Sequence, residues 1–220
     1  MSVSNPRTSV LAEIIREKNK RSHPKILVVG CGRGIEAAVL ALELHAEVIG
    51  IDINTRFDIE AGRHAKLISG DATAMDFPDD TFDIVYSYHA LEHIPDYHKA
   101  LREMSRVLRA GGVWCIGTPN RRRLVGYVGG DSSWREKLAW NWVDWRMRLT
   151  GRFRNEYGAH AGFTSKELGE ILSCHFADTH EVTNEYYRRL YAKNKISVSL
   201  LIKSGIGPFV FPSVYFLGNK

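Results

Sequence analysis

The chain has 220 residues, of which 44% are hydrophobic and 25% charged, and its formal net charge at pH 7 is +5. This length allows a sizeable core in one domain with additions, and the ordinary composition excludes a repeat or low-complexity protein. Residues 1–6 lack the basic-then-apolar order of a signal peptide, and Lys, Gly and Pro interrupt the apolar stretch 196–217, which argues against a membrane-spanning helix.

Three cysteines, Cys31, Cys115 and Cys174, lack the C-x-x-C spacing of a metal or redox motif. Each lies in an apolar segment, so we expect three buried free thiols and a reducing compartment. The predicted location is therefore cytoplasmic, with a peripheral position at the inner face of the membrane as the alternative.

The first predicted element is a buried parallel strand at 26–29, followed by the turn Gly30-Cys31-Gly32-Arg33-Gly34 and a helix over 35–44. Glycines in such a turn let the backbone pass close to a ligand where a Cβ would clash. The spacing is G-x-G-x-G, whereas a dinucleotide fingerprint would need a glycine at Ile35.

The next strands each end in polar residues. The strand 47–52 ends in Asp52, about 20 residues beyond the glycines, where a carboxylate can accept hydrogen bonds from both hydroxyls of a ribose. A strand at 65–68 precedes Asp71, and another follows Phe82. Asp96 is predicted to cap a helix that runs to Arg109 and ends at Gly111-Gly112, before a fifth strand at 113–117.

These ordered motifs, over residues 25–120, resemble class I S-adenosylmethionine (SAM) methyltransferases of type 11. The resemblance implies an α/β fold, a Rossmann-like doubly wound sheet of seven mostly parallel strands with an antiparallel edge strand. It also implies SAM as cofactor, with Asp71 on the adenine amino group and the next backbone N–H on a ring nitrogen. The cofactor-binding residues implied are Gly30, Cys31, Gly32, Gly34, Asp52, Ile53, Asp71, Ala72 and Tyr88.

One residue departs from the family pattern. The family carries an acid two residues before the first glycine, where it organises the methionine end of the cofactor, and this chain has Val28. The departure favours an alternative in which the chain is a non-catalytic SAM-binding or partner-binding module. The main prediction remains a methyltransferase of a biosynthetic pathway.

The segment after the fourth strand carries His89, Glu92 and His93. A near-neutral histidine suits removal of a proton from a hydroxyl acceptor, so His89 and His93 are the predicted bases and Glu92 their orienting partner. The segment resembles that of ubiquinone-type O-methyltransferases, some of which use a divalent metal at a matching Glu-x-x-Glu-His. His89 replaces the first glutamate, and a helical zinc motif does not suit a strand exit, so we predict no metal.

Residues 121–160 are predicted to form a helical insertion after the fifth strand. Residues 121–154 contain nine Lys or Arg, three acids and four of the five tryptophans. Ser133 with Glu136 forms a capping box for a helix over 134–150 with an apolar face. Three interpretations stay open: a helix packed on its own domain, a lid that rests on an anionic membrane, and a nucleic-acid surface.

The rest of the chain completes one domain over 1–220, with a core of 25–120 and 161–220. A helix is predicted over 9–20, covering the cofactor, and another from the Thr164–Glu167 capping box to Cys174; final strands are predicted to start at 181–183 and to span 212–217. Tyr157 and His160 are the candidate substrate contacts. We expect methyl transfer to a hydroxyl, rather than nitrogen or carbon, of a small lipid-tailed or sugar molecule.

Overall fold

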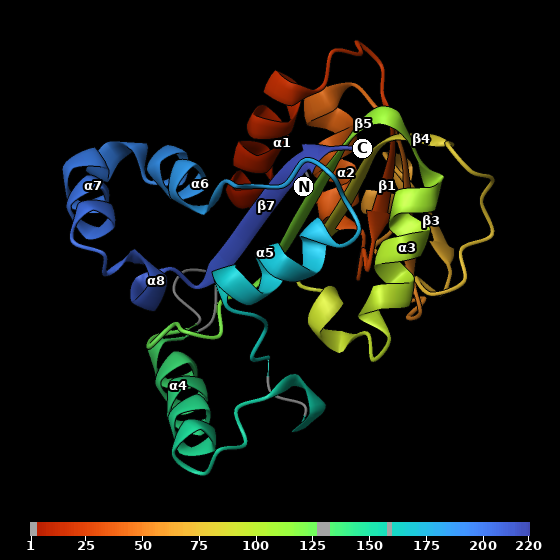
Figure 1. The fold of residues 1–220 in the computed structure, drawn as a ribbon. Coiled ribbons are helices and arrows are strands. Elements are labelled where there is room, and N and C mark those ends of the chain that lie inside the picture. The colour runs from red at the N-terminus through yellow and green to blue at the C-terminus, as the bar shows by residue number, and fades with distance from the viewer. Residues whose placement is uncertain (1–3, 127–132, 158–159) are drawn as a thin grey trace.

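The computed structural model describes residues 4–126, 133–157 and 160–220. Within these ranges seven strands form one sheet, flanked by helices (Figure 1). The strands are β1 Lys25–Val29, β2 Glu47–Asp52, β3 Lys66–Ser69, β4 Phe82–Tyr88, β5 Leu108–Pro119, β6 His180–Glu181 and β7 Ser213–Asn219. The helices are α1 Pro6–Lys18, α2 Ile35–Leu44, α3 Tyr97–Val107, α4 Trp134–Leu149, α5 Ser165–Ser173, α6 Thr183–Leu190, α7 Lys195–Lys203 and α8 Gly207–Val210.

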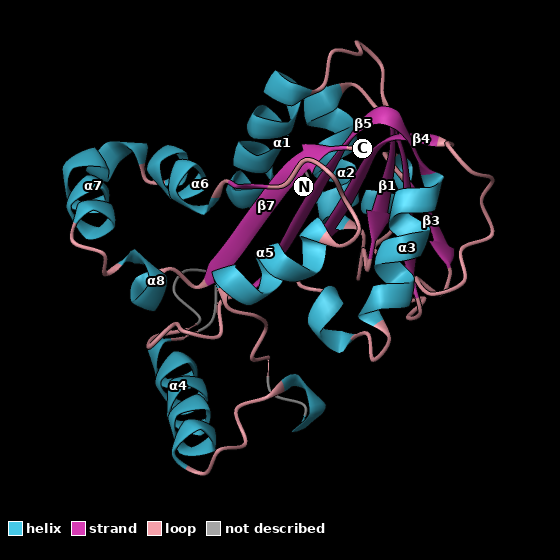
Figure 2. Cartoon of the chain, viewed as in Figure 1, coloured by secondary structure: helices cyan, strands magenta, loops and turns pink. Residues whose placement is uncertain are grey.

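The strand order is β3-β2-β1-β4-β5-β7-β6. Strands β1 to β5 pair in parallel, whereas β7 is antiparallel to both β5 and β6. Helices α1, α2 and α6 cover one face of the sheet and α3 and α5 the other (Figure 2). The predicted fold class is confirmed, with the antiparallel strand one position inside the edge.

The topology determines where a ligand can bind. The chain leaves β1 in one direction toward β2 and β3, and returns on the other side of β1 to form β4. In open α/β sheets a crevice forms at this switch point, outside the carboxyl ends of the strands. The loops that follow β1, β2, β3 and β4 therefore surround one site.

Local signals explain most element boundaries. Helix α2 and strand β2 occupy the predicted ranges, and Asp96 caps α3 by accepting a hydrogen bond from the Lys99 amide at 2.9 Å. The predicted end of that helix is wrong. It stops at Val107 because Leu108 already pairs with Phe82 in the sheet, so Gly111-Gly112 lies within β5.

Two further expectations need correction. Strand β6 ends at Glu181, and Thr183 begins helix α6, where its hydroxyl accepts a hydrogen bond from the Tyr215 amide at 3.0 Å. Cys31 and Cys115 are buried free thiols as predicted, but Cys174 is exposed at the end of α5. Among the described residues, no helix is both long and apolar enough to cross a bilayer.

The insertion leaves and rejoins the core at one point. Asn120, directly after β5, forms a parallel bridge with Phe163, and the Arg121 amide donates to the Phe163 carbonyl at 3.0 Å. Helix α4 lies between these points and projects away from the sheet (Figure 1). Its predicted capping box is present, with the Glu136 amide donating to Ser133 Oγ at 3.3 Å. Residues 127–132 and 158–159 of the predicted insertion lie outside the described ranges.

Candidate active site

The turn after β1 approaches its neighbours too closely for side chains. Gly30 has φ +70°, and a Cβ there would lie 2.2 Å from the Ala90 Cβ. Gly32 has φ +53°, but a Cβ at that position would meet nothing within 4 Å. Because both backbones are left-handed, glycine is the residue that fits without strain. The turn is thus packed on one side and open on the side where a ligand would lie.

Asp52 links the turn to the end of β2. Its Oδ2 accepts a hydrogen bond from the Gly32 amide at 2.8 Å, and its Oδ1 accepts one from the Asn54 amide at 2.8 Å. These bonds fix the direction of the carboxylate while each oxygen keeps a further lone pair. The geometry suits acceptance of hydrogen bonds from two neighbouring hydroxyls.

A cavity of about 600 Å³ opens at the carboxyl ends of β1 to β4. Its lining includes six of the residues predicted to bind the cofactor: Gly30, Gly32, Asp52, Ile53, Asp71 and Ala72. Two hydrogen bonds from Thr73 to Asp71 Oδ1, at 2.7 and 2.9 Å, hold the pKa of that carboxyl below its usual range, so it is an anion at neutral pH. The cavity combines open backbone and two acids, which fits an adenosine bearing a positive charge.

Three predicted cofactor residues are not part of the lining of this cavity. Cys31 is buried beside Gly50, and burial raises the pKa of its thiol to about 12, so it is a packing residue. Gly34 forms the N-cap of α2. Tyr88 lines a second cavity, where its ring packs 3.9 Å from the His89 ring.

His89 lies between the two cavities. It lines both, has φ +51°, and its Nε2 lies 2.9 Å from Ser213 Oγ on β7. Removal from bulk water, and then the charge of Arg123, lower the pKa of His89 to about 3. The imidazole is therefore neutral at pH 7, and its low pKa makes it a weak base. A left-handed backbone at a histidine costs conformational energy and is typical of functional sites.

The second cavity has a volume of about 410 Å³ and an aromatic wall. Tyrosines from β4, α6 and β7 line it together with Arg7 of α1, and Lys137 and Trp140 of α4 reach it from the insertion. The insertion therefore overhangs this cavity, and α1 reaches it through Arg7. Sequence reasoning missed the contributions of Arg7, Ser213 and the α6 tyrosines, because they come from α1, β7 and α6, far from His89 in the sequence, and only the tertiary fold gathers them at this cavity.

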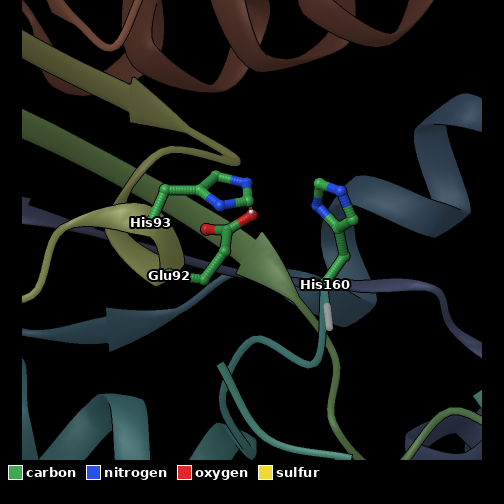
Figure 3. Close-up of side chains that lie close together, drawn as sticks. All are labelled: Glu92, His93 and His160. Atoms are coloured by element: carbon green, nitrogen blue, oxygen red, sulfur yellow. Dashed lines mark ion pairs between the residues drawn. The ribbon is translucent and has the colours of Figure 1, made fainter. Parts of the chain in front are cut away.

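Glu92 and His93 follow His89 in the short helix Leu91–His93, and the insertion brings His160 to them (Figure 3). The rings of His93 and His160 meet edge to face with centroids 4.7 Å apart. Burial raises the pKa of Glu92 to about 7, whereas burial and the neighbouring His160 lower the pKa of His93. His160 also lines the second cavity. The backbone of Tyr157 closes the turn Asn155–Tyr157, and its side chain lies outside the described parts.

The polar side of helix α4 packs on residues 121–126, the segment that leaves β5. Asn141 exchanges hydrogen bonds with the Gly126 backbone, Asp144 pairs with Arg123 at 3.1 Å, and Arg148 donates to the Arg121 and Arg123 carbonyls. Its apolar face points outward instead, with Trp142 70% and Leu149 86% exposed. The interpretation in which this face packs on its own domain is therefore wrong.

Comparisons with known proteins agree with this geometry. Residues 27–116 match the family model described as a methyltransferase domain. The chain is 38% identical over 101 residues to the sterol 24-C-methyltransferase erg6 of Aspergillus fumigatus, covering 42% of this chain and 27% of that protein. It is 36% identical over 115 residues to the demethylmenaquinone methyltransferase of Staphylococcus aureus strain JH9, covering 48% and 47%. The chain thus spans less than half the length of these curated relatives.

A solved structure extends the likeness of the fold. The YcgJ protein from Bacillus subtilis superposes with a TM-score of 0.57 at 17% identity, covering 96% of this chain and 97% of that one. The sheet order and the glycine cradle define a class I methyltransferase fold. Residues 27–116 are therefore similar to the methyltransferase domain of SAM-dependent enzymes, and this likeness implies SAM as the methyl donor.

Proposed function

We propose that this chain is an enzyme that transfers the methyl group of SAM to a hydroxyl oxygen of a small molecule held in the second cavity. The single observation that carries the proposal is that His89 lines both cavities, so one side chain faces the cofactor side and the acceptor side. Bound SAM supplies an electrophilic methyl carbon on a sulfonium. The domain arrangement we propose is a core of 25–120 and 161–220 with the insertion 121–160 above the acceptor.

Within this proposal, the oxygen bonds to the methyl carbon as the carbon–sulfur bond breaks, and the neutral His89 then accepts the hydroxyl proton, which a weak base can take because alkylation of the oxygen makes it strongly acidic. Ser213 holds the ring through the 2.9 Å contact at Nε2. His93, at the cofactor cavity, is the alternative base, and Glu92 orients it from 3.8 Å. Much of the rate enhancement comes from alignment of the acceptor by the aromatic wall.

The cofactor assignment can be tested without knowing the acceptor. Isothermal titration with S-adenosylhomocysteine is expected to show binding that Asp52→Ala weakens by at least roughly tenfold, because hydrogen bonds to a charged group each contribute about 1.5–3 kcal/mol. Asp76→Ala, at an exposed carboxylate that does not line this cavity, is the matched control. Equal affinity in wild type and Asp52→Ala would contradict the ribose assignment.

Catalysis is tested with tritiated SAM and lipid or sugar extracts. His89→Ala is expected to keep S-adenosylhomocysteine binding and to slow turnover by roughly a hundredfold or more, the usual contribution of a general base. Full turnover in both His89→Ala and His93→Ala would end the proposal of a histidine base. A carbon acceptor is the second candidate, since one relative is named a sterol 24-C-methyltransferase.

A binding module without catalysis is favoured by one observation. Val28, which replaces the family's acid, is fully packed in β1 beside Tyr86 of β4, so it offers no polar contact to a ligand. Methyl release from labelled SAM separates the two functions. Transfer to any compound of the extract supports the enzyme; tight S-adenosylhomocysteine binding with no transfer supports the module.

We also propose that the outward face of α4 rests on an anionic membrane, which gives a cytoplasmic protein a peripheral position. The face consists of Trp134, Leu138, Trp142, Trp145 and Leu149, all exposed. Exposed Arg135 and Arg146 lie on the same helix, and Arg135 stacks on Trp134 at 5.4 Å. Aromatic residues beside cations are favoured at the lipid–water interface.

Vesicle co-sedimentation tests this surface. The chain is expected to bind vesicles with 30% phosphatidylserine at low salt and to bind phosphatidylcholine vesicles less. Leu149→Ser combined with Trp142→Ser should abolish sedimentation, whereas Leu42→Ser, at an exposed leucine of α2, should not. Binding that survives the double change, or dimerisation through this face with no vesicle binding, would exclude the membrane as its partner.

A further inference from the structure

Three side chains converge where the insertion meets the core. One ligand atom each from Glu92, His93 and His160 lies within 4.8 Å of the other two, which makes them the one such cluster among the described residues. Figure 3 shows the His93 and His160 rings facing each other across a gap, with the Glu92 carboxylate beneath. Ligands around a shared ion at about 2.1 Å lie about 3.4 Å apart in tetrahedral geometry. The 3.8 Å separation of Glu92 Oε1 and His93 Nε2 is close to that value.

The Glu92 carboxylate is the unusual member of the cluster. Its side chain is 0% exposed, yet neither oxygen has a hydrogen-bond partner in another described residue. Buried polar groups in folded proteins are almost always satisfied, because an unpaired one loses its hydration without compensation. The carboxylate therefore lacks a ligand that the site is built to supply, and a cation would satisfy it.

The insertion holds the third member in place. Arg123 donates from Nη2 to the His160 carbonyl at 2.8 Å, and Asp144 of α4 compensates its charge. His160 is thus carried by a segment that is tied to α4. The alternative is that two exposed imidazoles lie close together without a shared ligand. It explains neither the anchoring of His160 nor the unsatisfied Glu92 carboxylate.

We propose that Glu92, His93 and His160 bind one divalent transition-metal ion, and that the insertion contributes the third ligand. Two imidazoles and one carboxylate favour zinc or a similar borderline ion over magnesium, which prefers oxygen ligands. Three protein ligands leave coordination positions open, as in catalytic rather than structural sites. The ion fastens the insertion to the core.

The position of the ion relates it to the acceptor. His93 lines the cofactor cavity and His160 the second cavity, so the ion lies between the two. An acceptor oxygen that took an open position would have its proton acidified by the ion. This use of the site rests on the proposed function, whereas metal binding itself does not.

The test uses the full chain, treated with chelator and then titrated with Zn²⁺ by calorimetry and with Co²⁺ by visible absorption. One equivalent is expected to bind, and at a hundredfold excess over Kd to raise Tm by roughly 5–10 °C. His160→Ala and Glu92→Gln should each weaken binding at least tenfold. The matched control is His175→Ala, since His98 and His175 form a separate imidazole pair at 2.9 Å that could bind metal adventitiously.

The outcomes are distinct. Zn²⁺ binding that is unchanged in both His160→Ala and Glu92→Gln, or that is lost in His175→Ala, overturns the proposal. Because neither Glu92 oxygen accepts a hydrogen bond from another described residue, Glu92→Gln should keep its metal-free Tm, which separates loss of a ligand from loss of the fold. S-adenosylhomocysteine binding should be the same in wild type and His160→Ala. If the wild type did not bind S-adenosylhomocysteine, the proposed function would be contradicted. The metal titration would still test the metal site, because it does not depend on the cofactor.

Discussion

Two glycines of the turn after β1, Gly30 and Gly32, can each be replaced by alanine. The two variants distinguish the effect of a Cβ on packing from its effect on ligand binding. Gly30 and Gly32 both have left-handed backbones, so an alanine at either position costs about 1–2 kcal/mol of conformational energy. At Gly30 the new Cβ would also lie 2.2 Å from the Ala90 Cβ, so backbone must move. Overpacking of this kind costs a further 1–3 kcal/mol or so.

The expected totals are about 2–5 kcal/mol for Gly30→Ala and about 1–2 kcal/mol for Gly32→Ala. For a chain of this size, 1 kcal/mol lowers Tm by about 2–4 °C, so Gly30→Ala should melt lower by several degrees more than Gly32→Ala. Binding of S-adenosylhomocysteine should show a different pattern. Gly32→Ala puts its methyl group into the open side of the cradle and should weaken binding by more than its small loss of stability implies.

Thermal melting and calorimetric titration of the two variants provide both readouts. Equal melting temperatures would mean that the Ala90 contact relaxes freely. If Gly32→Ala bound S-adenosylhomocysteine as tightly as wild type, the cradle would not be the surface that the ligand approaches.

Two further changes test buried charges. Burial raises the pKa of Glu36 from 4.5 to about 7, so the folded state keeps a proton that the unfolded state loses; stability should fall as pH rises between these values, by up to about 3 kcal/mol above pH 7. The free energy of unfolding of Glu36→Gln, measured by urea unfolding, should not show this fall with pH. Parallel plots of this free energy against pH for wild type and Glu36→Gln would contradict the prediction. Asp144→Ala leaves Arg123 buried without a carboxylate and should cost about 3–5 kcal/mol, whereas Glu170→Ala, in an exposed pair, should cost less than about 1 kcal/mol.

The cofactor half of the site was predictable because its determinants are local. A buried strand, a glycine turn and a helix start lie within 20 residues, and each strand end that follows contributes one acid. Parallel strands then bring these ends to one edge of the sheet without further information. Asp52 could therefore be assigned to the site from its spacing, whereas Asp71 was assigned from the family resemblance; both line one cavity.

The acceptor half depends on contacts that no local pattern encodes. His89 was recognisable as a candidate, but its partner Ser213 is 124 residues away. That contact exists because β7 inserts antiparallel beside β5; helix α6, which precedes β7 in the chain, adds tyrosines to the same cavity. Likewise, His89-x-x-Glu92-His93 offered no third ligand, since His160 reaches the other two only through the return of the insertion to the core.

Helix α4 shows how a correct element can still be oriented wrongly. Its capping box and apolar stripe are evident in the sequence, and an apolar stripe normally faces the core. The opposite occurs because the chain leaving β5 presents backbone carbonyls and the Arg123 guanidinium, which need polar partners. Asn141, Asp144 and Arg148, spaced three and four residues apart, satisfy them.

That polar docking leaves the tryptophans facing outward, and the two faces cannot be exchanged. Turning α4 over would bury the apolar stripe but leave Arg123 without a carboxylate and several carbonyls without donors, each a cost of about 1–3 kcal/mol. The exposed apolar face is therefore a consequence of a satisfied polar interface rather than of poor packing. Large outward-facing apolar surfaces of this kind mark interaction sites, so α4 contributes Lys137 and Trp140 to the second cavity while other residues of the same helix present an apolar face to the surroundings.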